Sequence, residues 1–321
     1  MALKEEILAI LESNRNRAVS GQELAEKLSV TRAAVWKAVK SLKTEGHIIE
    51  AVTNRGYRLQ TMSDVLSAAG IKTCLKHDCR VEVYDKLEST NITAKLAALN
   101  GAPANTVIAA NCQTGGRGRR GRAFYSPQKS GVYFSVILRP NVNAKESVLL
   151  TTAAAVSAAE AIEELTGKKT LIKWINDVYV EGKKCVGILS EAVFDCESGA
   201  VDSVIVGIGI NVSTHDFPPE IADKAGSIGA VSRNALVAAV TDKLIDICES
   251  LPDNSHLVRY RKRCFLLGDE ITVMPFGGEK YNATALSVDD EGRLVVKTDS
   301  GEEKALSNEE VSVRSNQYDK E

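Results

Sequence analysis

Four arginines alternate with glycines in one short segment of this chain, Gly115-Gly116-Arg117-Gly118-Arg119-Arg120-Gly121-Arg122. Like charges repel, and glycine carries the highest entropic cost of ordering, so this segment is unsuited to a protein core. It suits a mobile loop that orders around an anion. Backbone amides can approach such a ligand closely, and guanidinium groups can make charge-assisted contacts to phosphate or carboxylate. The sequence therefore predicts an anion-binding loop.

The same loop also contains the dinucleotide-binding pattern G-x-G-x-x-G, formed by Gly116, Gly118 and Gly121. That pattern needs a helix that begins by the third glycine and directs its N-terminus at a pyrophosphate. Here Pro127 and Gly131 precede another expected strand, and no helix is expected at Gly121. A Rossmann-type nucleotide site is therefore disfavoured.

Other polar clusters lie at or near the ends of expected strands. The segment 88–91 (E-S-T-N) offers hydroxyls, an amide and backbone N–H groups where a helix starts, although one of its residues must also cap that helix. The segment 173–177 (K-W-I-N-D) could bind a ligand or form a plain surface turn. Lys184 lies in an otherwise apolar strand, so it either reaches solvent or points at an anion. The segment 207–211 (G-I-G-I-N) ends a buried strand with an amide, and its glycines allow close backbone approach.

The composition is that of a soluble globular protein with two or three domains. The chain has 321 residues, of which 44% are hydrophobic and 26% charged, and its net charge is −2. Any nucleic-acid binding must therefore be local. No apolar run is long enough to span a membrane, and the acidic start is unlike a signal peptide. We expect a cytoplasmic protein without a membrane partner.

The cysteines and histidines indicate neither disulfides nor a metal site. The four histidines are dispersed, and no two cysteines form a C-x-x-C pair. We expect small buried thiols and no structural metal. The seven cysteines are Cys74, Cys79, Cys112, Cys185, Cys196, Cys248 and Cys264.

The first sixty residues have the pattern of a winged helix-turn-helix. A first helix ends near Asn14, and a capping box at Ser20 opens a short second helix. A third helix runs from Thr31 to Gly46, and a hairpin with a basic tip at 53–56 follows it. Between Thr31 and Leu59 there are six basic residues and only two acidic ones. This local excess of positive charge suits contacts to phosphates. A protein-interaction module is the alternative, and Trp36 could either pack or contact DNA. The expected DNA-binding residues are Arg32, Lys37, Lys40, Lys43 and Arg55.

The rest of the chain predicts an α+β fold with three domains in total, at residues 1–63, 64–267 and 268–321. Central strands often follow one another directly, which favours a mixed sheet over a doubly wound parallel one. An alanine-rich helix over 147–165 should lie against this sheet. Short strands with glycine-containing turns after residue 268 predict a small SH3-like β-barrel. The expected central strands are Val81–Tyr84, Val107–Ala110, Val132–Leu138, Leu171–Trp174, Lys184–Ser190 and Val201–Ile210.

Taken in order, these motifs resemble the biotin–protein ligases. They are E-S-T-N, Q-x-x-G-R-G-R-R-G-R, K-W-x-N-D, G-K-K-x-x-G-I-L-x-E and G-I-G-I-N. With its winged helix-turn-helix, the chain resembles the bifunctional bacterial form, the biotin operon repressor, over essentially its whole length. The resemblance implies a catalytic domain similar to class II aminoacyl-tRNA synthetases. It implies that biotin and ATP, with Mg²⁺, form biotinyl-5′-adenylate, and that biotin is then transferred to a lysine of biotin carboxyl carrier protein. It also implies a biotin-responsive repressor, for which we expect a homodimer promoted by the adenylate to bind operator DNA.

The resemblance also implies the site residues. Lys184, Arg119 and Asp177 would form the catalytic set, with Lys184 on the carboxylate and α-phosphate and Asp177 receiving the incoming lysine. No protein metal ligands are implied, because phosphates and water would hold Mg²⁺. The biotin-binding set would be Ser89, Thr90, Asn91, Gln113, Gly116, Arg117, Gly118, Arg119 and Lys184. The adenylate-binding set would be Arg117, Arg119, Arg120, Arg122 and Asn211.

Two departures from the family pattern and two alternative functions accompany this interpretation. Ile175 stands where the family usually has proline, and the region 225–230 lacks the tryptophan that stacks on adenine in some members. Trp174 would help to form an apolar wall around biotin or would be purely structural. A repressor that only senses biotin would not need the phosphate chemistry of Lys184, Asp177 and the arginine loop. A lipoate-type ligase normally lacks both the arginine-rich signature and the DNA-binding domain.

Overall fold

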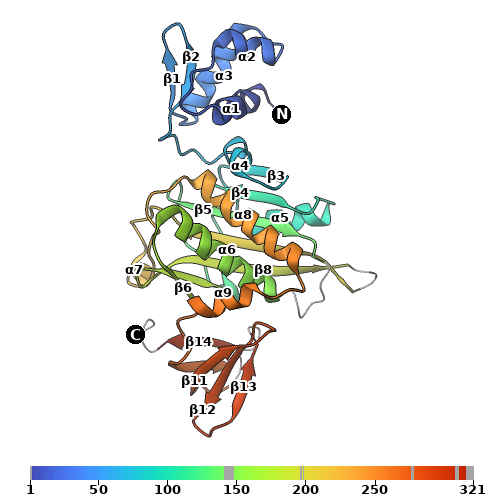
Figure 1. Cartoon of the computed structure of the whole chain (residues 1–321), viewed down its shortest axis with the longest axis vertical. Coiled ribbons are helices and arrows are strands. Elements are labelled where there is room, and N and C mark those ends of the chain that lie inside the picture. The colour runs from blue at the N-terminus through green and yellow to red at the C-terminus, as the bar shows by residue number, and fades with distance from the viewer. Residues whose placement is uncertain are drawn as a thin grey trace. The chain divides into compact units, whose positions relative to one another are not determined.

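The structure is a computed structural model, and it describes residues 2–140, 148–195, 197, 199–275, 278–307 and 311–315. The chain divides into two compact units (Figure 1). Unit 1 comprises Met1–Lys76 together with Ser232–Ala238, and unit 2 comprises His77–Val231 together with Ala239–Glu321. Each unit is described separately below.

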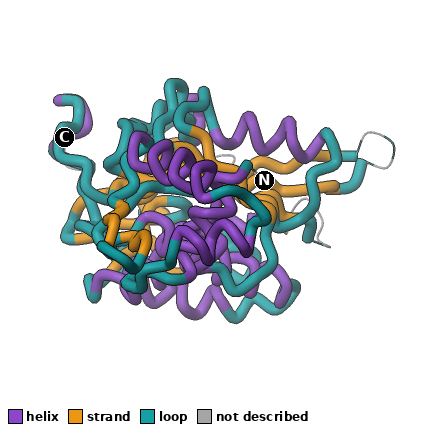
Figure 2. Tube along the Cα trace, turned by 90° about the horizontal axis from the view of Figure 1, so that it is seen from above, coloured by secondary structure: helices purple, strands orange, loops and turns teal. Residues whose placement is uncertain are grey.

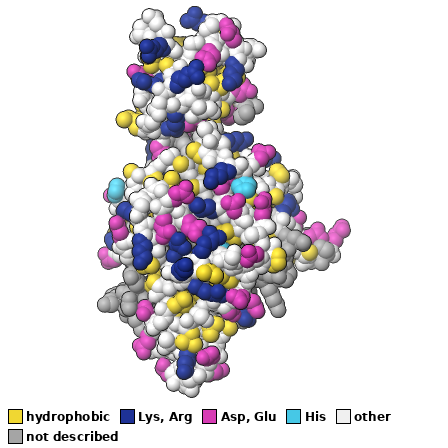
Figure 3. Space-filling model, in the orientation of Figure 1, with side chains coloured by type: hydrophobic (Ala, Val, Ile, Leu, Met, Phe, Trp, Pro, Cys, Tyr) yellow, Lys and Arg dark blue, Asp and Glu magenta, His cyan; other side chains and the backbone are white. Residues whose placement is uncertain are grey.

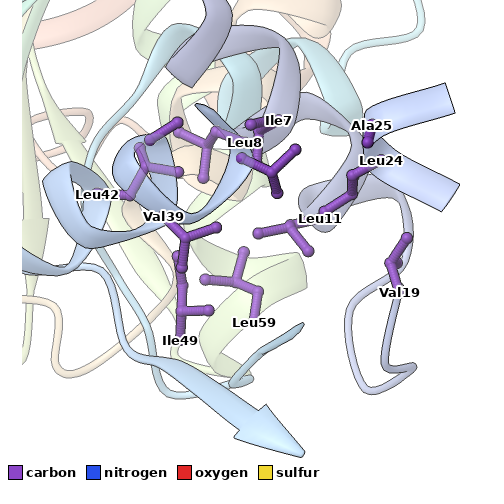
Figure 4. Close-up of a cluster of buried hydrophobic side chains, with 12 residues drawn as sticks. Ile7, Leu8, Leu11, Val19, Leu24, Ala25, Val39, Leu42, Ile49 and Leu59 are labelled. Carbon is purple, nitrogen blue, oxygen red and sulfur yellow. The ribbon is translucent and has the colours of Figure 1, made fainter. Parts of the chain in front are cut away.

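Unit 1 contains the expected helix-turn-helix and hairpin. Ser20 caps α2 by accepting the backbone N–H of Glu23 at 3.0 Å, and Thr31 caps α3 through the N–H of Ala34 at 3.2 Å. Val39 and Leu42 of α3 are buried with side chains of α1 and the hairpin (Figure 4). The prediction of a helix-turn-helix is confirmed. Its elements are α1 (Leu3–Ser13), α2 (Gly21–Lys27), α3 (Arg32–Thr44), β1 (Ile49–Val52), β2 (Gly56–Leu59) and α4 (Ala68–Cys74).

Unit 2 is built on a seven-stranded mixed sheet with the strand order β3-β4-β5-β9-β8-β7-β6. Only β3 and β4 pair in parallel, and the other neighbours are antiparallel. The prediction of a mixed sheet is confirmed, but β7 was not predicted. The strands are β3 (Arg80–Tyr84), β4 (Thr106–Ala110), β5 (Gly131–Leu138), β6 (Thr170–Lys173), β7 (Asp177–Val180), β8 (Lys183–Phe194) and β9 (Val201–Asn211).

Two helices cover opposite faces of this sheet (Figures 1 and 2). α5 (Thr90–Leu99) packs on β4, β5 and β9, where Ala94 and Ala98 meet the buried Ile205. α6 (Leu149–Thr166) lies on the other face, because Thr151 contacts Ser190 at 2.9 Å, and side chains alternate along β8. The helix predicted over 147–165 is present, although Ser147 lies outside the described residues. The remaining helical elements are η1 (Arg119–Gly121), α7 (Pro219–Ala222), α8 (Arg233–Ser250), which was not predicted, and α9 (His256–Arg263).

The C-terminal part of unit 2 forms a five-stranded antiparallel sheet with the order β13-β12-β11-β10-β14. Its buried side chains include Ile271, Val273 and Ala285. The short strands predicted after residue 268 are present. The strands are β10 (Glu270–Pro275), β11 (Tyr281–Val288), β12 (Leu294–Thr298), β13 (Glu303–Leu306) and β14 (Val311–Ser315).

The expectation of small buried thiols holds only in part. Cys79, Cys185 and Cys264 are buried, Cys112 and Cys248 are partly buried, and Cys74 is exposed, while Cys196 lies outside the described residues. Burial raises the pKa of Cys185 to about 12. Within the described parts of the chain, no helix has the length and apolarity needed to cross a lipid bilayer.

A buried histidine makes the stability of unit 2 depend on pH. His256 is 1% exposed, and its Nε2 lies 2.9 Å from Thr152 Oγ1. Burial, reinforced by the nearby Arg259, lowers the pKa of His256 from 6.5 to about 4. The unfolded chain therefore binds a proton at this position below about pH 6.5, whereas the folded chain binds it only near pH 4. The stabilisation is complete above pH 6.5 and is lost as the pH falls through 4.

We expect this titration to remove about 3 kcal/mol from the free energy of unfolding of unit 2 between neutral pH and pH 4. Urea unfolding can be followed by Trp174 fluorescence in a Trp36→Phe background. In this background His256→Leu should flatten the pH dependence by that amount, because carboxylate titrations are common to both proteins. Identical pH dependence in the two proteins would contradict the assignment.

Candidate functional site

A pocket opens on the α5 face of the central sheet. Its walls are the start of α5, the beginning of the arginine-rich segment and the middle of β8 and β9. Five of the predicted biotin-binding residues line it: Ser89, Thr90, Asn91, Gln113 and Arg117. No binding role was predicted for the other lining residues, which are Phe124, Gly187, Leu189, Gly207, Ile208 and Gly209.

Glycines on the two strands make room for this pocket. Gly187 and Gly209 are paired across β8 and β9, and a Cβ atom on either would overlap the ring of Phe124. A Cβ atom on Gly207 would overlap the amide of Asn91. The glycines of G-I-G-I-N therefore allow a close approach of side chains, as the pattern predicted.

A network of buried and partly buried polar groups holds the pocket walls together. The side-chain oxygen of Gln113 accepts the backbone N–H of Thr90 at 2.8 Å, and its amide donates to Ser126 at 3.0 Å. Asn91 donates to Glu191 at 2.6 Å and accepts from Ser135 at 2.7 Å. Because the protein itself engages both ends of the Asn91 amide, this side chain supports the pocket. Ser135 could have been suspected from sequence as the one polar side chain near the centre of an apolar strand.

A β-bulge brings the predicted catalytic lysine onto the pocket face. Asp177 of β7 pairs with Gly187 of β8, but the register shifts after Val178, so that Tyr179 pairs with Lys184. This shift places Lys184 on the same face as Asp177 and Gly187, whereas uninterrupted alternation would turn it to the opposite face. Lys184 Nζ lies 2.7 Å from Asp177 Oδ1.

Arg119 of the loop interacts electrostatically with Asp177 of this ion pair. It is half-buried, and its guanidinium approaches Asn176 Oδ1 at 3.4 Å. Burial, followed by repulsion from Arg120, lowers the pKa of Arg119. Asn176 is itself fixed, because its amide donates to the carbonyl of Ile188 at 2.8 Å. Two cations and one carboxylate thus meet where β6, β7 and β8 come together.

The other arginines of the loop are exposed. Arg117 reaches Glu88 at 3.4 Å, and Arg120 has a positive φ of 58°. The segment folds back on itself, with the N–H of Gly118 donating to the carbonyl of Arg122 at 2.7 Å. No α-helix begins at Gly121, which agrees with the exclusion of a Rossmann-type site. The predicted mobility of the loop stays a prediction.

Asn211 and the segment after it adjoin the strand that carries Lys184. Asn211 is 5% exposed, and its Oδ1 has no hydrogen-bond partner among the described residues. Its carbonyl accepts the N–H of Ile228, and the carbonyl of Lys184 accepts the N–H of Gly226. The unpaired Oδ1 is a buried acceptor that a ligand could satisfy. Between these points the segment brings Phe217 against the ring of Tyr125, with centroids 6.2 Å apart.

The suggestion that Trp174 helps to form the biotin wall is not supported. Trp174 does not line the pocket; it is 4% exposed, and its Nε1 donates to the carbonyl of Gly292 in the C-terminal sheet region at 3.0 Å. The peptide bond between Trp174 and Ile175 is cis. Among the described residues, no group of three His, Cys, Asp or Glu side chains is placed to hold a metal ion.

Unit 1 presents a separate basic surface. The predicted DNA-binding residues Arg32, Lys37, Lys40, Lys43 and Arg55 are all exposed. Trp36 is 54% exposed, and the ammonium of Lys40 lies 5.2 Å from the centre of its ring. A groove beside the hairpin is lined by Arg55 together with Asn16, Arg17, Ala18, Val52 and Arg58, and the sequence analysis had not named Arg17.

The chain matches two family models. Residues 83–211 match the biotin/lipoate A/B protein ligase family, and residues 4–58 match a helix-turn-helix domain. The bifunctional ligase/repressor BirA of Bacillus subtilis (strain 168) is 35% identical over 318 residues, which cover 95% of this chain and 97% of that protein. The protein of the same name from Escherichia coli (strain K12) is 26% identical over 307 residues, covering 92% of this chain and 93% of that protein.

A solved structure shares the fold of the ligase part. The biotin protein ligase from Aquifex aeolicus in complex with biotin and ATP aligns with a TM-score of 0.62 and 27% identity. The alignment covers 74% of this chain and 99% of that one.

The glycine floor of the pocket gives a direct test of the ligand site. We expect Gly209→Ala to weaken biotin binding about tenfold or more, because the added methyl group competes with Phe124 for the same space, and such overpacking costs about 1–3 kcal/mol. Isothermal titration with biotin measures the effect. Gly21→Ala is the matched control, because its Cβ would meet only the Tyr57 ring at 3.6 Å. Equal affinities in the two variants would refute this placement of the pocket.

Proposed function

Because this chain belongs to the bifunctional ligase/repressor family that joins a helix-turn-helix domain to a biotin ligase domain, we propose that it activates biotin with ATP, transfers biotin to a carrier protein and represses transcription. The ion pair of Lys184 and Asp177, beside Arg119 and close to the glycine-floored pocket, is the observation that carries the catalytic part.

In the first step, a carboxylate oxygen of biotin attacks the α-phosphorus of ATP. The bond from that phosphorus to the oxygen bridging to the β-phosphate breaks, and pyrophosphate leaves with the bonding electron pair. Two anions meet in this step, so cations must neutralise the developing charge. Lys184 and Arg119 supply such charge, and Lys184 exchanges its contact with Asp177 for the carboxylate and α-phosphate oxygens.

In the second step, the amine of a carrier lysine attacks the acyl carbon of biotinyl-5′-adenylate. The bond from that carbon to the phosphate oxygen breaks, and AMP leaves. Asp177 receives the incoming ammonium and takes the proton that must depart before attack. The carrier is biotin carboxyl carrier protein.

The remaining residues divide between the two parts of the adenylate. Ser89, Thr90 and Gln113 hold the ureido ring of biotin with Gly116, Arg117 and Gly118, and Asn91 supports them from behind. Arg117, Arg119, Arg120 and Arg122 enclose the adenylate, and Asn211 offers its unpaired Oδ1 to the adenosine or phosphate. Mg²⁺ would enter with ATP. Lys184 and Arg119 are cations and cannot ligate a metal ion, so phosphates and water would hold Mg²⁺.

Two alternative functions explain less of the site. A repressor that only senses biotin has no use for Lys184 and Arg119 beside the pocket. A lipoate-type ligase shares the adenylation chemistry but normally lacks the arginine-rich segment and the helix-turn-helix. Comparing biotin with lipoate as the trigger of pyrophosphate release separates all three.

The finer architecture and the assembly are also part of the proposal. The central sheet is of the class II aminoacyl-tRNA synthetase type, and the five-stranded C-terminal sheet is an SH3-like barrel with domain boundaries near residues 63 and 267. The chain forms a homodimer promoted by biotinyl-5′-adenylate. One helix-turn-helix per chain contacts only a small stretch of duplex, so a dimer that pairs two half-sites is needed for tight, specific binding.

We expect Lys184→Ala to slow biotin-dependent pyrophosphate release by about 10²- to 10³-fold, the usual cost of losing one group that stabilises transition-state charge. Lys183→Ala is the matched control: it removes the same charge one residue away, from an exposed side chain whose ammonium lies 3.4 Å from the carbonyl of Ala222. The catalytic assignment is wrong if both variants keep wild-type rates.

We expect Arg55→Gln to weaken binding to a DNA duplex selected from a random pool and to lower the slope of log K against log salt by about one, because one phosphate contact is lost. Lys72→Gln, an exposed α4 residue of the same unit, should leave both quantities unchanged. The measurement uses full-length protein carrying biotinyl-5′-adenylate.

Sedimentation of the same samples checks the assembly. The protein should be a dimer with the adenylate and largely a monomer with biotin alone. A monomer without ligand that binds the selected duplex equally tightly would rule out the proposed regulation.

A further inference from the structure

The turn that carries Asn176 and Asp177 is held from outside the pocket by one fully buried tyrosine. Tyr260 of α9 has no exposed surface, and its hydroxyl donates to the carbonyl of Ile175 at 3.1 Å. Burial, with smaller contributions from Cys264 and Asp177, raises the pKa of Tyr260 well above its usual range. The phenol therefore stays protonated and remains a hydrogen-bond donor.

The C-terminal sheet holds the same turn from a second direction. The indole of Trp174 donates to the carbonyl of Gly292, which lies between β11 and β12. The residues just before this carbonyl are bound to α9, because Arg261 donates to the carbonyl of Val288 at 2.6 Å and pairs with Asp290 at 2.6 Å. The turn, α9 and the 288–292 segment thus form a closed set of contacts.

α9 is also fixed on the central domain. Arg259 pairs with Glu160 at 2.8 Å, and Arg263 pairs with Glu163 at 2.7 Å, both on α6. On the face seen in Figure 3, Lys and Arg side chains lie beside Asp and Glu side chains. α9 is bound both to α6 and to the 288–292 segment. The Tyr260 hydroxyl is therefore held in place, and its hydrogen bond fixes the carbonyl of Ile175.

We infer that Tyr260 is a positioning residue for the proposed ligase reaction, and that it acts by holding the 174–176 turn so that Asn176 meets Arg119 and Asp177 meets Lys184. This inference rests on the proposed function. Tyr260 does not line the biotin pocket, so it affects the placement of the reacting charges and not the affinity for biotin. A displaced turn would lower the rate of adenylation because the cations would no longer converge on the α-phosphate.

The test is Tyr260→Phe in the full-length protein, which removes one hydroxyl and keeps the ring. We expect kcat for biotin-dependent pyrophosphate release to fall about tenfold, while KM for biotin changes less than about twofold, at a temperature well below unfolding. Trp174→Phe, which removes the link to Gly292 and keeps an aromatic ring, should shift kcat in the same direction.

Thr106→Val is the matched control, because Thr106 is also fully buried and donates its hydroxyl to a backbone carbonyl, that of Pro103, at 2.8 Å. It lies on β4, separated from β7 by three strands in the sheet order. It should lower thermal stability with little effect on kcat. The inference is overturned if Tyr260→Phe and Trp174→Phe keep the wild-type kcat, or if Thr106→Val loses as much. A wild-type protein that released no pyrophosphate in response to biotin would overturn the proposed function itself, and the inference with it.

Discussion

The bulge in β8 is the constraint on which the chemistry of this site depends. Lys184 and Gly187 are three residues apart, so in a regular strand they would face opposite sides of the sheet. The register shift between β7 and β8 turns Lys184 to the same face as Gly187. Lys184 Nζ then lies 2.7 Å from Asp177 Oδ1. Cys185, the extra residue of β8 at the shift, is fully buried, and burial raises its pKa to about 12.

The two faces of the central sheet have different roles: one carries the pocket, and the other packs against α6. On the pocket face, glycines at 187, 207 and 209 leave room for Phe124 and Asn91, and buried hydrogen bonds fix the walls. On the other face, the alanine-rich helix α6 is buried along most of its length. Small side chains let a helix approach the strands closely, and close packing makes the sheet a stiff support. A stiff support keeps Asp177 of β7 and Lys184 of β8 in place beside Arg119 of the arginine-rich segment.

Sequence patterns were sufficient where local rules decide the structure. The caps at Ser20 and Thr31 and the apolar face of α3 predicted the helix-turn-helix, because capping and helical periodicity are local. Five residues of the pocket were likewise placed by motif. The strand β7 was missed because Asp177 and the three residues after it form a run too short to stand out. The bulge was missed because it depends on how two strands pair, which neither strand reveals alone.

Trp174 shows why a motif can identify a segment and still mislead about a side chain. Its place within K-W-I-N-D suggested contact with biotin, but its indole points to a carbonyl about 120 residues away in the sequence, at Gly292. A buried indole N–H must find an acceptor, and here the turn between β11 and β12 supplies it. The motif therefore contains residues of two kinds, those that contact the charged groups of the site and those that fasten the turn. Asn176 contacts Arg119 and Asp177 pairs with Lys184, while Trp174 and the carbonyl of Ile175 fasten the turn to the rest of the protein. Within five residues, one part of the motif fastens the backbone and the next part meets the charged groups of the site, and only the tertiary structure distinguishes them.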